Sequence, residues 1–318
     1  MANTHSLFQD FCSNITLSQS KSNSLKTSRN ALRSDIKSWF SDKGKKQPTF
    51  CWQGSFSMKT VVNPLSGGEY DLDDGVYLHG YEDKEMVDWP SPATVHSWVK
   101  DAVKDRTKSD PTDKDTCVRV TYSVGYHIDL PIYIVKDDIA YLAHKTKGWI
   151  ESDPKAFRSW FIDKVTSDTY GEQLRSVVKY LKAWKDYKGI SLKGIEITIL
   201  ATQNFDQYTD RDDKCLRDTV AAIISSLEDD FSCVKPVAPG EDLFDDASAA
   251  KQSSILDGLH ILKSNLDKAI SESNEKMATE YLRKSFGDRY PLGKDISVNS
   301  AFATSAAPGV LKHDGRSA

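Results

Sequence analysis

Two short stretches of the chain contain residues whose types and spacing suit phosphate chemistry. Gln53 is followed by Gly54 and Ser55, and a glycine–serine turn is small enough to let phosphate oxygens approach backbone N–H groups. Asp71 and Asp73 stand two residues apart in a run with strand character, so both carboxylates would point to one face. Carboxylates that close repel each other by about 4 kcal/mol at a protein-like dielectric unless a cation lies between them. Oxygen ligands beside a phosphate site indicate Mg²⁺, and therefore phosphoryl or nucleotidyl transfer.

A calcium-binding loop is the first alternative for the acidic stretch. An EF-hand loop has aspartates at positions one, three and five, glycine at six and glutamate at twelve. Counted from Asp71, Gly75 falls on position five and Val76 on position six, and strand-like residues follow where the loop should continue. The sequence therefore disfavours calcium. If the motif stood alone, an aspartate-rich surface turn would be the other alternative.

A third carboxylate, Asp129, lies on an alternating strand among apolar neighbours that would make an unpaired charge costly. By itself it is typical of a hydrogen-bonded structural aspartate. Set beside the strand of Asp71 and Asp73, it would complete a three-carboxylate site. Two metal ions about 4 Å apart in such a site would activate an attacking hydroxyl and stabilise a departing pyrophosphate, with Asp129 assisting deprotonation.

Apolar spacing predicts the elements that must position these residues. In the first half of the chain, helical or strand spacing occurs at residues 22–43 (helix), 48–52 (strand), 57–62 (helical turn), 70–78 (strand), 92–106 (helix) and 118–135 (hairpin). Beyond residue 149 the spacing is helical at 154–166, 171–187, 212–231 and 246–286, whereas 195–200 fits either a strand or the start of a buried helix. We therefore predict an α+β fold with a mixed-sheet lobe at 1–150, a helical lobe at 151–296 and a flexible tail at 297–318.

Composition narrows the class of protein. The 318 residues suffice for two subdomains, and the formal net charge of −4 argues against broad affinity for nucleic acid or anionic membranes. The five cysteines are scattered without zinc-type spacing, which indicates reduced thiols in a cytoplasmic protein. No apolar run approaches the roughly 18 residues of a membrane span, and the N-terminus lacks the features of a signal peptide. We expect a cytoplasmic protein that binds neither membrane nor, stably, nucleic acid.

Several motifs taken together resemble a known family. The motifs lie at Gln53–Phe56, Tyr70–Gly75, His127–Pro131, Tyr180–Lys185 and Pro236–Leu243. In this combination the chain resembles the bacterial cGAS/DncV-like nucleotidyltransferases (CD-NTases), and within them the DncV-type 3′,3′-cGAMP synthase branch. Each motif alone is weak, and the combination is specific.

The resemblance implies both a fold and an activity. The fold would be a polymerase-β-like nucleotidyltransferase core with a C-terminal helical lobe, bridged by the long N-terminal helix, with NTP in the cleft. The enzyme would use Mg²⁺, or Mn²⁺ in its place, to make a cyclic di- or trinucleotide such as cGAMP from ATP and GTP in anti-phage (CBASS) signalling. The alternatives are a linear oligonucleotide or tRNA-type nucleotidyltransferase and a catalytically inactive nucleotide-binding interaction protein.

Roles for individual residues also follow from the resemblance. The Mg²⁺ ligands would be Asp71, Asp73 and Asp129. The donor phosphates would be bound by Gln53, Gly54 and Ser55. Lys182 would meet the triphosphate as a point charge, with a solvated helix lysine as the alternative. Arg119 would reach a phosphate or be an ordinary surface arginine, and Asp242 would contact a base edge or have a capping or turn role.

The resemblance implies two kinds of partner as well. In many systems of this family, a ubiquitin-activation-like (E1/E2-like) ligase conjugates the C-terminus of the cyclase to targets, which here would be Ala318. A simply disordered terminus is the alternative. A downstream effector would respond to the cyclic nucleotide product.

Overall fold

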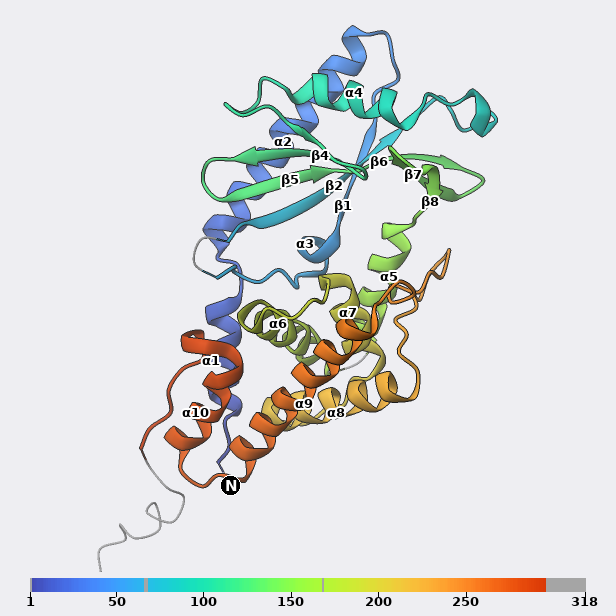
Figure 1. The fold of residues 1–318 in the computed structure, drawn as a ribbon. Coiled ribbons are helices and arrows are strands. Elements are labelled where there is room, and N and C mark those ends of the chain that lie inside the picture. The colour runs from blue at the N-terminus through green and yellow to red at the C-terminus, as the bar shows by residue number, and fades with distance from the viewer. Residues whose placement is uncertain (1, 66–67, 168, 296–318) are drawn as a thin grey trace, which may run out of the picture.

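The chain folds into two lobes, one built on a sheet and one built of helices (Figure 1). The computed structural model describes residues 2–65, 68–167 and 169–295, so the predicted tail at 297–318, including Ala318, lies outside the described residues. In the described part of the chain, no helix has the length and apolar character needed to span a bilayer. The α+β class that the sequence predicts is confirmed.

The sheet lobe is organised around one central strand. The strands are β1 (Thr49–Gln53), β2 (Tyr70–Leu78), β3 (Thr112–Asp113), β4 (Val118–Tyr122), β5 (Tyr126–Leu130), β6 (Ile132–Lys136), β7 (Ile139–His144) and β8 (Gly148–Glu151). Their order is β3-β4-β5-β2-β6-β7-β8, and β1 pairs with β2. The centre is mixed because β2 runs parallel to both β5 and β6 and antiparallel to β1.

Alternation along the strands separates a core face from a polar face. On one face, Leu72, Val76 and Ile128 pack with two helices, α2 (Gln19–Asp42) and α4 (Pro92–Val103). These helices bury the apolar stripe that the sequence predicts. Figure 1 shows both helices on this side of the sheet. The opposite face of β2 and β5 is thereby left for polar side chains.

The second lobe is a helical bundle. Its helices are α5 (Pro154–Thr166), α6 (Gly171–Lys188), α7 (Gly194–Gln203), α8 (Asp212–Asp229), α9 (Ala249–Ser271) and α10 (Glu275–Phe286). The ambiguous run at 195–200 is helical, within α7, and the predicted helix at 246–286 is interrupted before α10 begins. Trp184, which we expected in the core rather than in base stacking, is buried there.

The N-terminal segment belongs to the helical lobe, which the sequence did not indicate. Helix α1 (His5–Ile15) places Phe8 and Phe11 in an aromatic cluster of that lobe, where Phe11 stacks on Tyr180 at 5.6 Å between ring centroids. The predicted long helix is confirmed as α2, but its buried residues pack in the sheet lobe. The N-terminal bridge between the lobes therefore consists of α1 and α2 in succession, with the chain extended at Ser18 between them.

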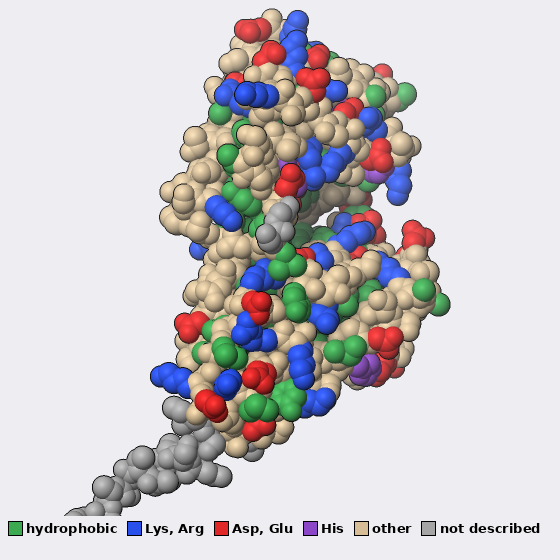
Figure 2. Space-filling model, turned by 60° about the vertical axis from the view of Figure 1, so that its left-hand side comes forward, with side chains coloured by type: hydrophobic (Ala, Val, Ile, Leu, Met, Phe, Trp, Pro, Cys, Tyr) green, Lys and Arg blue, Asp and Glu red, His purple; other side chains and the backbone are tan. Residues whose placement is uncertain are grey.

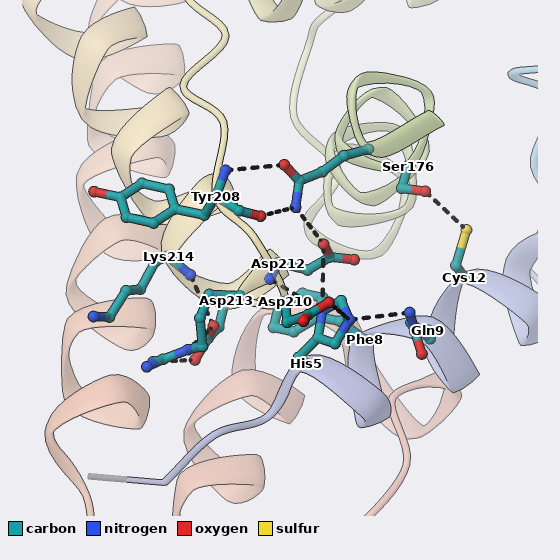
Figure 3. A network of polar contacts seen from close by, with 12 residues as sticks. His5, Phe8, Gln9, Cys12, Ser176, Tyr208, Asp210, Asp212, Asp213 and Lys214 are labelled. Carbon is teal, nitrogen blue, oxygen red and sulfur yellow. Dashed lines mark hydrogen bonds and ion pairs between the residues drawn. The ribbon is translucent and has the colours of Figure 1, made fainter. Parts of the chain in front are cut away.

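Polar contacts hold α1 in place (Figure 3). The Asp212 backbone N–H donates to Nδ1 of His5 at 3.4 Å. The Asp212 carboxylate accepts a hydrogen bond from the Tyr180 hydroxyl at 3.0 Å. Nε2 of His5 contacts the side-chain amide of Gln9 at 3.0 Å. Because Asp212 is buried, these partners offset the cost of removing its carboxylate from water. Residues 2–15 thus lie with the helical lobe, outside the sheet lobe to which the predicted boundaries assigned them.

Candidate active site

Three strands bring the predicted acidic residues and the glycine–serine turn to one place. In the parallel pair of β2 and β5, Asp73 is the register partner of Asp129 and Asp71 that of His127. On the other side of β2, Gln53 at the end of β1 is the register partner of Asp73. Side chains of register partners point to the same face, so both carboxylates and the turn face the helical lobe.

The adjacent carboxylate, Asp74, faces the opposite side of the sheet. It is fully buried and accepts a bidentate pair of hydrogen bonds from Arg33 on α2, with Nε at 2.7 Å. This pairing explains how a buried carboxylate is tolerated beside apolar core residues. Asp74 therefore links helix α2 to the central strand β2, and its side chain does not belong to the polar face.

The turn approaches Asp73 so closely that only glycine fits at its first position. Gly54 has φ of +59°, in the left-handed region, and a Cβ built there would lie 2.2 Å from Oδ2 of Asp73. Helix α3 (Gly54–Met58) starts at this residue, earlier than the predicted helical turn. The close approach fixes the spacing between the turn and the acidic strand.

Gln53 is held beneath the turn. Its side chain is buried, and its Oε1 accepts a hydrogen bond from the Tyr133 hydroxyl at 3.1 Å. Tyr133 in turn stacks on Tyr77 with 4.9 Å between ring centroids. In this arrangement Gln53 is anchored to β6 and orients the turn, while its amide nitrogen is buried without a hydrogen-bond partner.

Burial and neighbouring charges shift the pKa of one of the acidic residues, Asp73. Burial, together with the charges of Asp71 and Asp129, raises the pKa of Asp73 to about 8, and the charge of Arg119 opposes them. A carboxyl group in such surroundings holds a proton at neutral pH until a cation displaces it. The donor set therefore fits an oxygen-preferring divalent cation, as the sequence suggests.

Asp129 is already paired with a cation from within the chain. Arg119, its register partner on β4, donates from Nε to Oδ1 and from Nη2 to Oδ2, both at 2.6 Å. Within the described ranges, no three acidic, histidine or cysteine side chains stand close enough together to hold a metal ion. Arg119, which we predicted to reach a phosphate, is instead committed to Asp129 in this arrangement.

A cavity of about 550 Å³ lies between the lobes and is lined by both. Its sheet-lobe wall contains the turn, Asp71 and Asp73. Its helical-lobe wall contains the cationic side chains of Arg158, Lys182, Lys185 and Lys235, together with Asp186, which pairs with Lys185 at 3.0 Å. Figure 2 shows the surface hollowed between the lobes, with Lys and Arg side chains along the hollow. In a negatively charged ligand with a bound cation, the cation would pair with the aspartates of one wall and the negative charge with the lysines and arginine of the other.

Lys182 is a buried lysine, not the solvated helix lysine that was the alternative. Its Nζ donates to the carbonyl and hydroxyl oxygens of Thr60 at 3.2 and 3.0 Å. Burial lowers its pKa to about 8, and the charge of Asp71 partly offsets this effect. A Cβ at Gly194 would lie 3.5 Å from Cε of Lys182, so the lysine is also packed against the start of α7.

Three of the cationic wall residues were not predicted from the sequence, and for one acidic residue, Asp242, the sequence left a base contact and a capping or turn role open. Lys185 lies one helical turn from Lys182, and this spacing could have identified it. Arg158 and Lys235 carried no signal because they enter the cavity from distant elements. Asp242 does not line the cavity; its Oδ1 accepts the backbone N–H groups of Cys233 and Phe244 at 2.7 and 2.9 Å. The turn role therefore describes Asp242 better than base contact.

Two family models match the chain. The nucleotidyltransferase domain described as cyclic GMP-AMP synthase DncV-like matches residues 48–133, and the C-terminal domain of cyclic GMP-AMP synthase matches residues 171–298. The first match contains the turn and the three aspartates, and the second contains Lys182. Each lobe is thus matched in the region that lines the cavity.

Individual relatives are similar over parts of the chain. The cyclic GMP-AMP synthase of Escherichia albertii is 29% identical over 191 residues, covering 56% of this chain and 42% of that protein. The cyclic GMP-AMP synthase of Vibrio cholerae is 26% identical over 301 residues, covering 76% and 67%. The chain therefore spans less than half of the Escherichia albertii relative.

Solved structures share the fold. Vibrio cholerae DncV in its GTP-bound form superposes with a TM-score of 0.79 at 19% identity, covering 91% of this chain and 96% of that one. The complex of the same enzyme with the linear intermediate 5′ pppA(3′,5′)pG gives a TM-score of 0.77 at 18% identity, covering 92% and 99%. Because the family models together match more than half of the chain, one in each lobe, this protein belongs to the bacterial cGAS/DncV-like nucleotidyltransferase (CD-NTase) family.

Proposed function

We propose that this protein is a Mg²⁺-dependent nucleotidyltransferase that joins NTPs, ATP and GTP foremost, into a cyclic di- or trinucleotide of the cGAMP type. One observation carries the proposal. A single cavity has Asp71 and Asp73 on one wall and Lys182 with further cations on the other. Family membership supports the same activity, and the named relatives are cyclic GMP-AMP synthases.

In the proposed reaction, the two walls of the cavity would have different roles. The cationic wall would bind the triphosphate, and the turn at Gly54 would place its α-phosphate near the acidic strand. A hydroxyl of the acceptor nucleotide would attack that phosphorus, forming a new P–O bond while the bond to pyrophosphate breaks. A second such reaction would close the ring. Divalent cations, when bound, would stabilise the developing charge on the attacking and leaving oxygens.

The three aspartates would have unequal tasks. Asp71 and Asp73 face the cavity and would be the first ligands of Mg²⁺ or Mn²⁺. Asp129 would complete the set, or accept the proton of the attacking hydroxyl, after exchanging at least one of its hydrogen bonds to Arg119. The freed guanidinium would then be available to a phosphate, which is the role predicted for it.

The pKa of Lys182 predicts a pH dependence of nucleotide binding. Because that pKa is lowered to about 8, the lysine is cationic below pH 8 and loses its charge above it. Affinity for a nonhydrolysable NTP should therefore fall above pH 8, by up to about ten-fold per pH unit. Lys182→Met should bind weakly throughout and lose the part of this step that the lysine contributes, leaving the part due to Asp73, whose pKa is also about 8. Lys188→Met, at an exposed position at the end of the same helix, should titrate like the unmodified protein. Isothermal titration calorimetry from pH 7 to 9 measures all three.

Product analysis tests the proposed activity. We expect incubation with pairs of NTPs and Mg²⁺ or Mn²⁺ to yield pyrophosphate and a product that resists phosphatase and exonuclease, with the mass of a cyclic nucleotide. A phosphatase-sensitive product would point to the linear alternative. Absence of metal-dependent pyrophosphate release with every NTP pair would refute the proposal and favour an inactive nucleotide-binding protein.

The biological setting is part of the same proposal. The cyclic product would activate an effector in CBASS anti-phage signalling, and an E1/E2-like ligase would conjugate Ala318 to targets. Both suggestions rest on the family resemblance. Ala318 lies outside the described residues, so the structure gives it no further support.

A further inference from the structure

One irregular segment connects the glycine–serine turn to the helical lobe. The strap, defined here as residues 58–63, starts at Met58, the last residue of α3, and leads to the loop before β2. Met58, Thr60, Val61 and Val62 line the cavity between the lobes. The strap is therefore a wall of the candidate active site, although it contains no residue with evident catalytic chemistry.

Cationic side chains from the helical lobe hold the strap at three points along its backbone. In each contact a lysine or arginine donates to a main-chain carbonyl oxygen. The contacts are Arg175 Nε to the Met58 carbonyl at 3.2 Å, Lys182 Nζ to the Thr60 carbonyl at 3.2 Å and Arg289 Nη1 to the Asn63 carbonyl at 2.9 Å. These hydrogen bonds satisfy three carbonyl groups of the strap. They help to fix its position together with the β-bridge between Val62 and Thr16 and the hydrogen bond from the Asn63 N–H to the Ile15 carbonyl at 2.6 Å.

The two arginines lie at opposite ends of the strap and are themselves fixed. Arg175, on α6, is buried and also pairs with Glu172 one turn away. Arg289, which follows α10, uses Nη2 to donate to the Ala183 carbonyl of α6 at 3.1 Å. Its guanidinium thus bridges the strap and the residue next to Lys182.

The strap is also tied to the turn. The backbone N–H of Thr60 donates to the Ser55 carbonyl at 2.9 Å. Thr60 therefore contacts the predicted phosphate-binding turn through its N–H and Lys182 through its carbonyl. A shift of the strap would change the distance between the two groups that are expected to grip the same triphosphate.

We propose that Arg175 and Arg289 are positioning residues that set the distance between the Gly54–Ser55 turn and Lys182 by clamping both ends of the strap. The inference rests on the proposed nucleotide-binding function of the cavity. Neither arginine lines the cavity, so their effect on a bound nucleotide is transmitted through the strap. Loss of either clamp loosens the grip on the triphosphate without removing any group that contacts it.

The test uses Arg289→Met and Arg175→Met in the full chain. Arg283→Met is the matched control, because it removes an arginine of the same lobe whose partner is the exposed Asp288 and not a carbonyl group of the strap. Three quantities are measured: the dissociation constant of a nonhydrolysable NTP with Mg²⁺, amide hydrogen exchange across 58–63, and the melting temperature. Arg289→Lys is included because lysine keeps the charge and one donor for the Asn63 carbonyl.

We expect faster exchange in the strap and a dissociation constant raised about ten-fold in both methionine variants, as loss of a charge-assisted hydrogen bond implies. Arg289→Lys should recover most of the affinity, and Arg283→Met should match the unmodified protein. Unchanged affinity in a folded Arg289→Met variant, or loss of affinity in Arg283→Met to the same degree, would overturn the inference. If the unmodified protein itself bound no nucleotide, the proposed function would fail, whereas the exchange measurement would still report whether the arginines clamp the strap.

Discussion

Replacing Asp71 and Asp73 together by asparagine should reduce metal-dependent pyrophosphate release by at least about a thousand-fold. Asparagine keeps the shape of each side chain and removes the charge that would hold the cation. Charge stabilisation by bound metal contributes several kcal/mol to such transition states, and about 4 kcal/mol corresponds to three orders of magnitude in rate. Rates are measured by release of labelled pyrophosphate from each NTP pair, and metal binding by Mn²⁺ electron paramagnetic resonance.

The melting temperature of the double variant shows whether its loss of activity is caused by misfolding. The pKa of Asp73 is about 8 in the folded protein and near its ordinary, lower value in the unfolded chain. Its contribution to the stability of the metal-free fold therefore falls as the pH rises from that ordinary value towards 8, and the loss is complete above pH 8. In EDTA at pH 9, the double variant should therefore melt no lower than the unmodified protein. Asp137→Asn with Asp138→Asn is the control, because both residues are exposed in a turn at positive φ that asparagine tolerates. Residual activity above one part in a hundred in the folded Asp71/Asp73 variant would contradict the metal assignment.

The sequence predicts those parts of the site whose positions depend on strand alternation and short motifs. Period-two alternation placed Asp71 and Asp73 on one face of β2, and the structure confirms that both line the cavity. Parallel pairing of β2 with β5 makes Asp129 the register partner of Asp73, but among the described residues the three carboxylates do not converge closely enough to form a metal site, so the three-carboxylate arrangement stays a prediction. The bidentate pairing of Asp129 with Arg119 was missed because cross-strand register depends on where the hairpin turns.

Other features depended on tertiary contacts that leave little trace in sequence. Helix α1 is short and rich in polar residues. The core position of its two phenylalanines depends on ring contacts with Tyr180 and Phe286 of the helical lobe, which are distant in sequence. Strands β7 and β8 were not predicted, because β7 has only three buried residues and β8 has none. The helical lobe itself followed from its apolar spacing, with an interruption before α10 that this spacing did not mark.

The second large effect is expected from Gly54→Ala. The new methyl group would have to occupy a point 2.2 Å from Oδ2 of Asp73, so either the turn or the acidic side chain must move. Displacement of about 1 Å at a reacting centre costs roughly a hundred-fold in rate. We expect the rate of pyrophosphate release under saturating NTP to fall by about that factor, with a smaller change in the melting temperature.

Gly44→Ala is the matched control for this substitution. Gly44 follows α2, is exposed, and has φ of +64°, close to the +59° of Gly54, but a Cβ there meets no atom within 4 Å. Both alanine variants therefore bear the same left-handed backbone strain, about 1–2 kcal/mol, and only Gly54→Ala adds the collision with Asp73. If the two variants lost equal stability while only Gly54→Ala lost activity, the close approach of turn and carboxylate would be the cause. Equal activity in the two variants would mean that the spacing between turn and acidic strand does not limit the reaction.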